Sequence, residues 1–341
     1  MRLPSSRWRW LVAACGLGLL AGALFWVAER LLAQSPRSPA EVAQQEKIPA
    51  PFSASRAEQY LAEIVAIGPR QSGSTGMAKQ QQLLLAFFSK QGGAAELQKF
   101  PARDPLTGKT LELANLIVRF RPQATKRYLL CAHYDTRPYP DEDKKNPRGL
   151  FVGANDGGSG VAALMEMSHH LSTLPESIGV DFVLFDGEEL VYDSQRDPYF
   201  LGSTHFARTY AQQQQELSGA FKPYEAGVLL DMIGDRELQI FYEQNSWNYA
   251  RKVTLEIWGT AERLGIRAFQ PRIRHTVRDD HLPLNEIARI PTTDLIDFDY
   301  PRPGFRQQSY WHTTADTIDK CSGHSLVSVI YVLHTWLKER G

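Results

Sequence analysis

The sequence has no excess of charge of either sign. Lys plus Arg number 38 and Asp plus Glu number 38 in a chain of 341 residues. Nucleic-acid-binding proteins usually carry a basic excess or a basic stripe, so this balance argues against a nucleic-acid partner. Hydrophobic residues make up 43% of the chain and charged residues 22%. That composition is typical of a folded globular protein and excludes a largely disordered one.

Cysteine is also scarce, with only Cys15, Cys131 and Cys321 in the chain. Three cysteines exclude a disulfide framework and a cysteine-based zinc module. At most one bridge, between Cys131 and Cys321, is possible in the globular part. The cysteine content therefore leaves the redox compartment open.

The N-terminus contains a long uncharged segment. Three arginines in residues 1–9 precede a run from Trp10 to Ala28 without charge, and its length is close to the roughly 20 residues that cross a bilayer as a helix. This pattern predicts a short cytoplasmic N-terminus (1–9), a signal-anchor (10–28) and an extracytoplasmic domain. A cleaved export signal is the alternative, which would make the protein secreted. Four prolines predict an extended linker over residues 29–53, and the globular domain is predicted over 54–341.

Apolar strands and amphipathic helices alternate along that domain. This order predicts a single α/β domain with a mostly parallel central sheet and helices on both faces. Strands are predicted over 113–120, 128–133, 180–185 and 227–233, and helices over 55–67, 76–91, 160–174, 248–264 and 324–337.

Polar side chains follow the ends of these strands, where open α/β sheets bind ligands. They are His133, Asp156 in a glycine-rich loop, Glu188 and Glu189, Asp231, and later His312. Nitrogen and oxygen donors of this kind suit a zinc site with an open coordination position.

The adjacent Glu188 and Glu189 alone could be a solvated strand end. Together with the other donors they indicate one metal ligand and one general acid/base. His169 and His170 are predicted as a surface pair, and His205, His275, His324 and His334 likewise as non-ligands.

In their order along the chain, these motifs resemble those of the zinc aminopeptidases of the bacterial leucyl aminopeptidase type. Further segments resemble the glutaminyl-peptide cyclotransferase branch. These are the insertion 191–198 after Asp186-Gly187-Glu188-Glu189, then Leu229–Gly234, Asp279-Asp280-His281-Leu282-Pro283, and Trp311-His312-Thr313. The chain departs at Asp294, where animal cyclases tend to have histidine.

The cyclase resemblance implies one zinc ion held by Asp156, Glu189 and His312. It implies Glu188 as the general acid/base, Asp279 and Asp231 as catalytic carboxylates near the amide nitrogen, and Trp311 as a wall of the substrate pocket. The substrates would be peptide or protein N-termini, with N-terminal glutamine cyclised to pyroglutamate.

Two other readings remain open from the sequence. With a second zinc on His133, Asp156 and Asp231, the same residues would form a dinuclear aminopeptidase; otherwise His133 would be a supporting group. The third reading is a non-catalytic ectodomain, which the presence of every proposed ligand disfavours.

Overall fold

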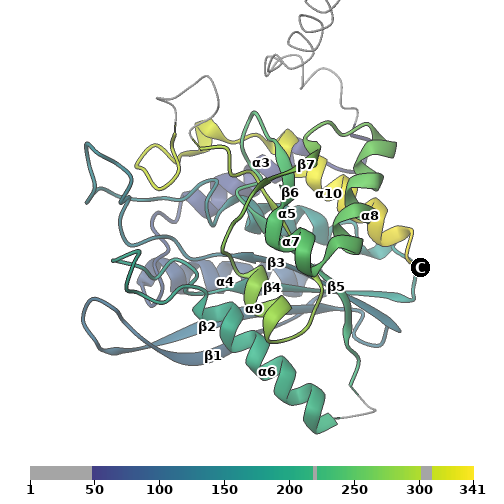
Figure 1. The fold of residues 1–341 in the computed structure, drawn as a ribbon, viewed down its shortest axis with the longest axis horizontal. Helices are drawn as coiled ribbons and strands as arrows, with labels where there is room; N and C mark the ends of the chain where they lie inside the picture. The colour runs from purple at the N-terminus through teal and green to yellow at the C-terminus, as the bar shows by residue number, and fades with distance from the viewer. Residues whose placement is uncertain (1–47, 218–220, 301–308) are drawn as a thin grey trace, which may run out of the picture. The chain divides into compact units, whose positions relative to one another are not determined.

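The computed structural model describes residues 48–217, 221–300 and 309–341 (Figure 1). The predicted cytoplasmic segment and signal-anchor lie outside these residues, as does most of the linker. Within the described parts of the chain, no helix is long and apolar enough to cross a membrane. The anchor therefore stays a prediction.

A six-stranded sheet forms the centre of the domain, in the order β1-β2-β4-β3-β5-β8. Its strands are β1 (Ala94–Arg103), β2 (Thr110–Phe120), β3 (Lys126–His133), β4 (Ile178–Phe185), β5 (Tyr224–Asp231) and β8 (Thr292–Ile296). A separate parallel pair consists of β6 (Ile240–Glu243) and β7 (Phe269–His275).

The central sheet is mixed, so the expectation of a mostly parallel sheet holds for β4, β3, β5 and β8 and is wrong for the edge formed by β1 and β2. The pairs β4–β3, β3–β5 and β5–β8 are parallel, whereas β1–β2 and β2–β4 are antiparallel. Only the short segment 104–109 joins β1 to β2, and a connection of that length permits only an antiparallel hairpin. The parallel part nevertheless includes all three strands whose ends were predicted to carry the site.

Helices cover both faces of the sheet, and alternate residues of the central strands pack against them. Leu130 and Ala132 of β3 face a core formed with α3, α4, α5, α8 and α10, while Leu129 and Cys131 face α6 and α9. The helices are α3 (Ala54–Val65), α4 (Thr75–Lys90), α5 (Ser159–Ser168), α6 (Leu201–Leu217), α7 (Gln244–Tyr249), α8 (Arg251–Leu264), α9 (His281–Glu286) and α10 (Gly323–Lys338).

Two predicted helices are shorter or divided. The helix predicted over 160–174 ends at Ser168 and is followed by a 3-10 turn over Leu171–Thr173, and the one predicted over 248–264 is split at Ala250 into α7 and α8. Cys131 and Cys321 are both buried and free, so the bridge that the sequence permitted is not formed.

Candidate active site

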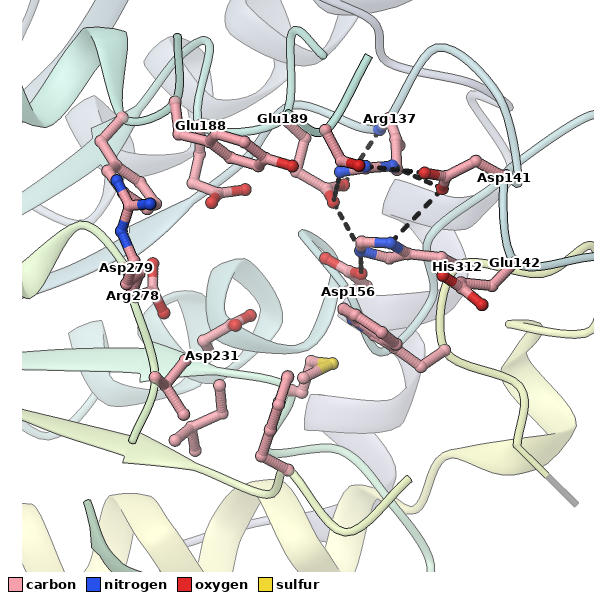
Figure 2. A pocket seen from close by; sticks show the side chains of 18 of the residues that line it. Arg137, Asp141, Glu142, Asp156, Glu188, Glu189, Asp231, Arg278, Asp279 and His312 are labelled. Carbon is pink, nitrogen blue, oxygen red and sulfur yellow. Dashed lines mark hydrogen bonds and ion pairs between the residues drawn. The ribbon is translucent and has the colours of Figure 1, made fainter. Parts of the chain in front are cut away.

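A cavity of about 400 Å³ lies at the edge of the sheet where the parallel strands end. His133 ends β3, Asp231 ends β5, and the turn that carries Glu188 follows β4. Glu188, Glu189, Asp156, Asp231, Asp279, Trp311 and His312 all line the cavity. Figure 2 shows the five labelled carboxylates among them that belong to Asp156, Glu188, Glu189, Asp231 and Asp279, together with the His312 ring, around this cavity.

Asp156 belongs to the tight loop between β3 and α5. The Asp316 carboxylate accepts the backbone N–H groups of Asn155 and Asp156 at 2.8 and 3.1 Å, which fixes this loop. Gly157 follows with a φ of 75°, and a Cβ there would lie 2.4 Å from the Asp135 carbonyl oxygen. Only glycine fits this position, so the loop sequence directly determines where Asp156 points.

Asp135 likewise fixes the turn after β4. Its carboxylate accepts the backbone N–H of Glu188 at 3.2 Å and that of Glu189 at 3.0 Å. The Asp135 carboxylate thus fixes the backbone of Glu188 and Glu189 relative to β3. The two glutamate side chains take no part in these bonds and can point in different directions.

Asp156, Glu189 and His312 bring three donor atoms together. His312 Nε2 lies 2.9 Å from Glu189 Oε1 and 3.4 Å from Asp156 Oδ2. All three residues are buried, and one ligand atom from each lies within 4.8 Å of the others. Two carboxylate oxygens and one imidazole nitrogen are a donor set that fits a zinc ion with an open position.

A second group shares Asp156 with the first. His133 Nε2 lies 3.2 Å from Asp156 Oδ1 and 3.2 Å from Asp231 Oδ1. These three residues also meet the distance condition for a common metal ion. The geometry of the donor atoms is thus compatible with one metal ion or with two.

Glu188 points into the cavity beside the first group. Its Oε2 lies 3.9 Å from His133 Nδ1, and its side chain is 13% exposed. Burial raises the pKa of the Glu188 carboxyl well above its usual range; His133 opposes this shift, and the charges of Glu189 and Asp279 add to it. A raised pKa brings a carboxyl group nearer the range in which it can both take and give a proton.

Asp279 and Asp280 have different surroundings at the bend just before α9, where Asp280 is the N-cap residue in the right-handed helical conformation. Asp280 Oδ1 accepts the Ser203 hydroxyl at 2.5 Å, which directs it toward α6. Asp279 lines the cavity, and its Oδ2 has no hydrogen-bond partner among the described residues. Burial, followed by the charges of Asp231 and Asp280, raises the pKa of Asp279 well above its usual range.

A buried group lies behind Asp279. His281 Nε2 is 3.3 Å from Glu243 Oε2, and His281 Nδ1 is 3.7 Å from Asp294 Oδ2. Burial raises the pKa of Asp294 well above its usual range, and the charge of Asp279 adds to the shift. The departure from animal cyclases at Asp294 therefore places a second carboxyl close to Asp279.

Aromatic side chains form part of the cavity wall. The Trp311 ring stacks on the His312 ring with centroids 3.9 Å apart, and it meets Phe298 edge-on at 5.3 Å. Ser194 of the 191–198 insertion lines the cavity too, as do Tyr199 and Phe200 directly after it. The predicted insertion thus contributes to the site.

The sequence reasoning missed Arg137 and Asp141, which also line the cavity. Arg137 donates its backbone N–H to Glu189 Oε2 at 3.0 Å, and Asp141 Oδ1 lies 3.5 Å from His312 Nδ1. Burial raises the pKa of Asp141, but hydrogen bonds with His312 and Arg137 outweigh it and hold that pKa well below its usual range. The only signal was the charge-rich segment after His133-Tyr134-Asp135.

The prediction that His169 and His170 are a surface pair is wrong. His170 is buried and lies 2.9 Å from the Glu166 carboxylate, while His169 Nε2 lies 2.7 Å from the Tyr60 hydroxyl. They pack against the start of the domain because α3 and residue Phe52 cover this side of α5. Neither lines the cavity.

The family model described as "Peptidase family M28" matches residues 115–337. The chain belongs to this family. It is 36% identical to the glutaminyl cyclase of Fimbriiglobus ruber in its crystal structure, over 86% of this chain and 98% of that one, with a TM-score of 0.79. A Zn-dependent exopeptidase from Parabacteroides distasonis is 30% identical over 86% of this chain and 100% of its own, with a TM-score of 0.75.

The glutaminyl-peptide cyclotransferase of Drosophila melanogaster is 25% identical over 287 residues, which are 77% of this chain and 75% of the relative. Together with the structural similarity, this confirms the predicted resemblance to the glutaminyl cyclase branch.

Proposed function

We propose that this chain is a zinc-dependent glutaminyl-peptide cyclotransferase. It converts the N-terminal glutamine of peptides or proteins to pyroglutamate and releases ammonia. The observation that carries the proposal is Asp279, a buried carboxyl residue that lines the cavity across from His312 (Figure 2). The similarity to glutaminyl cyclases supports it.

In this proposal Asp156, Glu189 and His312 hold the zinc ion. A zinc ion held there would supply Lewis-acid stabilisation of the negative charge that develops on the γ-carbonyl oxygen of the glutamine. Glu188 accepts a proton from the attacking α-amine and passes it to the departing ammonia. Its position in the cavity, beside His133 and next to the proposed ligand Glu189, suits both tasks.

Asp279 accepts a hydrogen bond from the γ-amide nitrogen and orients it, with Asp231 beside it. His133 holds Asp231 and Asp156 in place through its Nε2 atom. Trp311 forms a flat wall against the substrate. Because the nucleophile is part of the substrate, orientation inside the cavity supplies much of the rate.

One observation favours a dinuclear aminopeptidase as the second candidate. His133, Asp156 and Asp231 form a donor group that shares Asp156 with the first group. A metal ion in each group would support hydrolysis of N-terminal residues by an activated water. The similar exopeptidase from Parabacteroides distasonis is described as zinc-dependent.

The products separate the two candidates. The purified protein is incubated with Gln-initiated and Leu-initiated peptides, and ammonia, free amino acids and zinc per chain are measured. The cyclotransferase predicts ammonia from the Gln-initiated peptide in equal amount to its cyclised product, with one zinc per chain. Faster release of free amino acid, with two zinc ions per chain, would establish the aminopeptidase instead.

We further propose that residues 10–28 anchor the enzyme in a membrane with the domain outside the cytoplasm. The three arginines before this run support that orientation. Fractionation of cells that express the full chain, followed by protease treatment of the intact cells, tests it. A soluble domain shortened at its N-terminus would indicate a cleaved signal.

A further inference from the structure

The segment after β3 crosses to the loop that carries His312. We propose that Asp141 is a positioning residue that orients His312 as a metal ligand, and that Arg137 holds Asp141 in that position. The inference rests on the metal ligands of the proposed function. It adds two residues that lie beside the proposed ligands but do not belong to the ligand set.

The first step is the orientation of the His312 ring. Its Nε2 faces the carboxylates of Glu189 and Asp156, while its Nδ1 lies 3.5 Å from Asp141 Oδ1. An imidazole that binds a metal through one nitrogen carries its proton on the other. A carboxylate that accepts this N–H fixes the tautomer and the ring orientation. Asp141 occupies that position.

The second step is the position of Asp141 itself. Arg137 donates from Nε to Asp141 Oδ1 at 2.7 Å and from Nη2 to Oδ2 at 2.9 Å. The same guanidinium lies 3.3 Å from Glu189 Oε1 through Nη1. Because the guanidinium is planar and rigid, it sets Asp141 and Glu189 relative to each other. Arg137 is buried, whereas Asp141 reaches the rim, where its side chain is 40% exposed.

The third step is the backbone of His312, which has a φ of 53°. This left-handed conformation is uncommon for a residue other than glycine and costs on the order of 1 kcal/mol, so surrounding contacts must hold it. The same segment supplies them. Glu142 donates its backbone N–H to the His312 carbonyl at 3.1 Å, and the Asp143 carboxylate accepts from the Thr314 backbone N–H and hydroxyl at 3.1 and 2.5 Å.

The charges of Asp141 and Arg137 also favour metal binding. Asp141 neutralises the Arg137 guanidinium, which would otherwise repel a divalent cation held by Glu189. Asp141→Asn therefore removes the charged acceptor of the His312 N–H and leaves Arg137 uncompensated. Both effects weaken metal binding.

The test is zinc affinity of the full chain, measured by competition with a chelating dye. The matched control is Asp193→Asn. Asp193 forms an equivalent ion pair with Arg196 on the neighbouring insertion, with Arg196 Nε donating to Asp193 Oδ2 at 2.6 Å. We expect the zinc Kd to rise by about 10–100-fold in Asp141→Asn and by less than about twofold in the control. The zinc Kd is measured well below the melting temperature of each variant, so a loss of stability alone does not raise it.

Arg137→Lys is the second variant, and it tests the same inference if Asp141→Asn does not fold. It keeps the charge but cannot bond to both carboxylates, so zinc affinity should fall by about tenfold. Asp141→Glu should restore part of the affinity lost in Asp141→Asn.

Zinc affinity of Asp141→Asn within about twofold of the wild type would overturn the inference, as would an equal loss in Asp193→Asn. A wild-type chain that binds zinc but releases no ammonia from Gln-initiated peptides would overturn only the proposed function.

Discussion

Glu188 and Glu189 are neighbours in the chain, but their carboxylates meet different partners at the cavity. Glu189 lies 2.9 Å from His312 Nε2 and receives the backbone N–H of Arg137. Glu188 instead approaches the Nδ1 side of His133 at 3.9 Å. The turn after β4 makes this divergence possible because the Asp135 carboxylate accepts both backbone N–H groups. The two side chains are not involved in these bonds and can point in different directions.

That divergence predicts the effect of Glu188→Gln. Glutamine keeps the shape of the side chain and leaves Asp156, Glu189 and His312 in place, so zinc should stay bound. Ammonia release should fall by about 10²–10⁴-fold, which is the usual contribution of a general acid/base. Zinc content and turnover are measured on the same preparation. If the substitution removes the zinc instead, Glu188 is a ligand and the two glutamates have exchanged roles.

The sequence reveals the centre of the fold better than its edges. The apolar runs of β3, β4 and β5 are recognisable because strands buried on both faces need apolar residues throughout. In contrast, β7 is largely exposed and shows no alternation, and the alternation of β1 shifts by one residue between Leu97 and Gln98. In β8, all five residues are buried, but the first three, Thr292, Thr293 and Asp294, are polar. Nothing local distinguishes such strands from loops.

The candidate site, too, is only partly predictable from the sequence. His133, Glu188, Glu189 and Asp231 are predictable because parallel strands bring their carboxyl ends to one edge of the sheet. The contact between Asp141 and His312 is not, because the two loops are far apart in the chain and no periodic pattern joins them. His170 was misplaced for a related reason. Only the folded chain shows that α3 and Phe52 cover it.

Gly157 should be among the least replaceable positions in the site. In Gly157→Ala the new Cβ would meet the Asp135 carbonyl oxygen at 2.4 Å, in addition to the cost of a φ of 75°. Gly265→Ala is the control, because Gly265 has a φ of 72° and nothing within 4 Å of the added Cβ. We expect a loss of about 1 kcal/mol in the free energy of unfolding for the control and at least about 2 kcal/mol more for Gly157→Ala.

Urea unfolding and zinc content measure the two variants. Only Gly157→Ala should also lose zinc, because it displaces the loop that carries Asp156. Equal losses of stability in both variants would show that the loop can move away from Asp135 at little cost.

His334 should make the domain sensitive to mild acid. Burial, followed by the positive charge of His170, lowers the pKa of His334 to about 4, whereas an unfolded histidine titrates near about 6.5. Between these values the unfolded chain binds the proton and the folded chain does not. Stability from this group is therefore present above pH 6.5 and is lost as the pH falls toward 4.

His334→Gln removes this titration and keeps a polar group near the Thr173 hydroxyl, which lies 2.7 Å from His334 Nε2. Between pH 7 and pH 5 the free energy of unfolding of the wild type should fall by on the order of 1 kcal/mol more than that of the variant. Urea denaturation at both pH values measures the difference. Parallel losses in the two proteins would mean that His334 is charged in the folded state.

The pair Asp279 and Asp280 separates the two enzymatic candidates. A cyclase must bind a neutral amide and help ammonia leave, so a carboxylate beside the amide nitrogen is required of it. An aminopeptidase binds its leaving group elsewhere and has no need of that carboxylate. Asp279→Ala should therefore abolish cyclisation of Gln-initiated peptides, by a factor that corresponds to several kcal/mol, while zinc content stays unchanged.

Asp280→Asn is the matched control because its side chain faces Ser203 of α6 and not the cavity. The asparagine amide can still accept the Ser203 hydroxyl, so ammonia release should change by less than about threefold, whatever the change in melting temperature. Full ammonia release by Asp279→Ala would remove the requirement for a carboxylate at the amide nitrogen. The aminopeptidase would then be favoured if Asp279→Ala still released leucine from Leu-initiated peptides at the wild-type rate, and if that rate exceeded cyclisation by the wild type. The reason is that the hydrolysis depends on His133, Asp156 and Asp231 but not on Asp279.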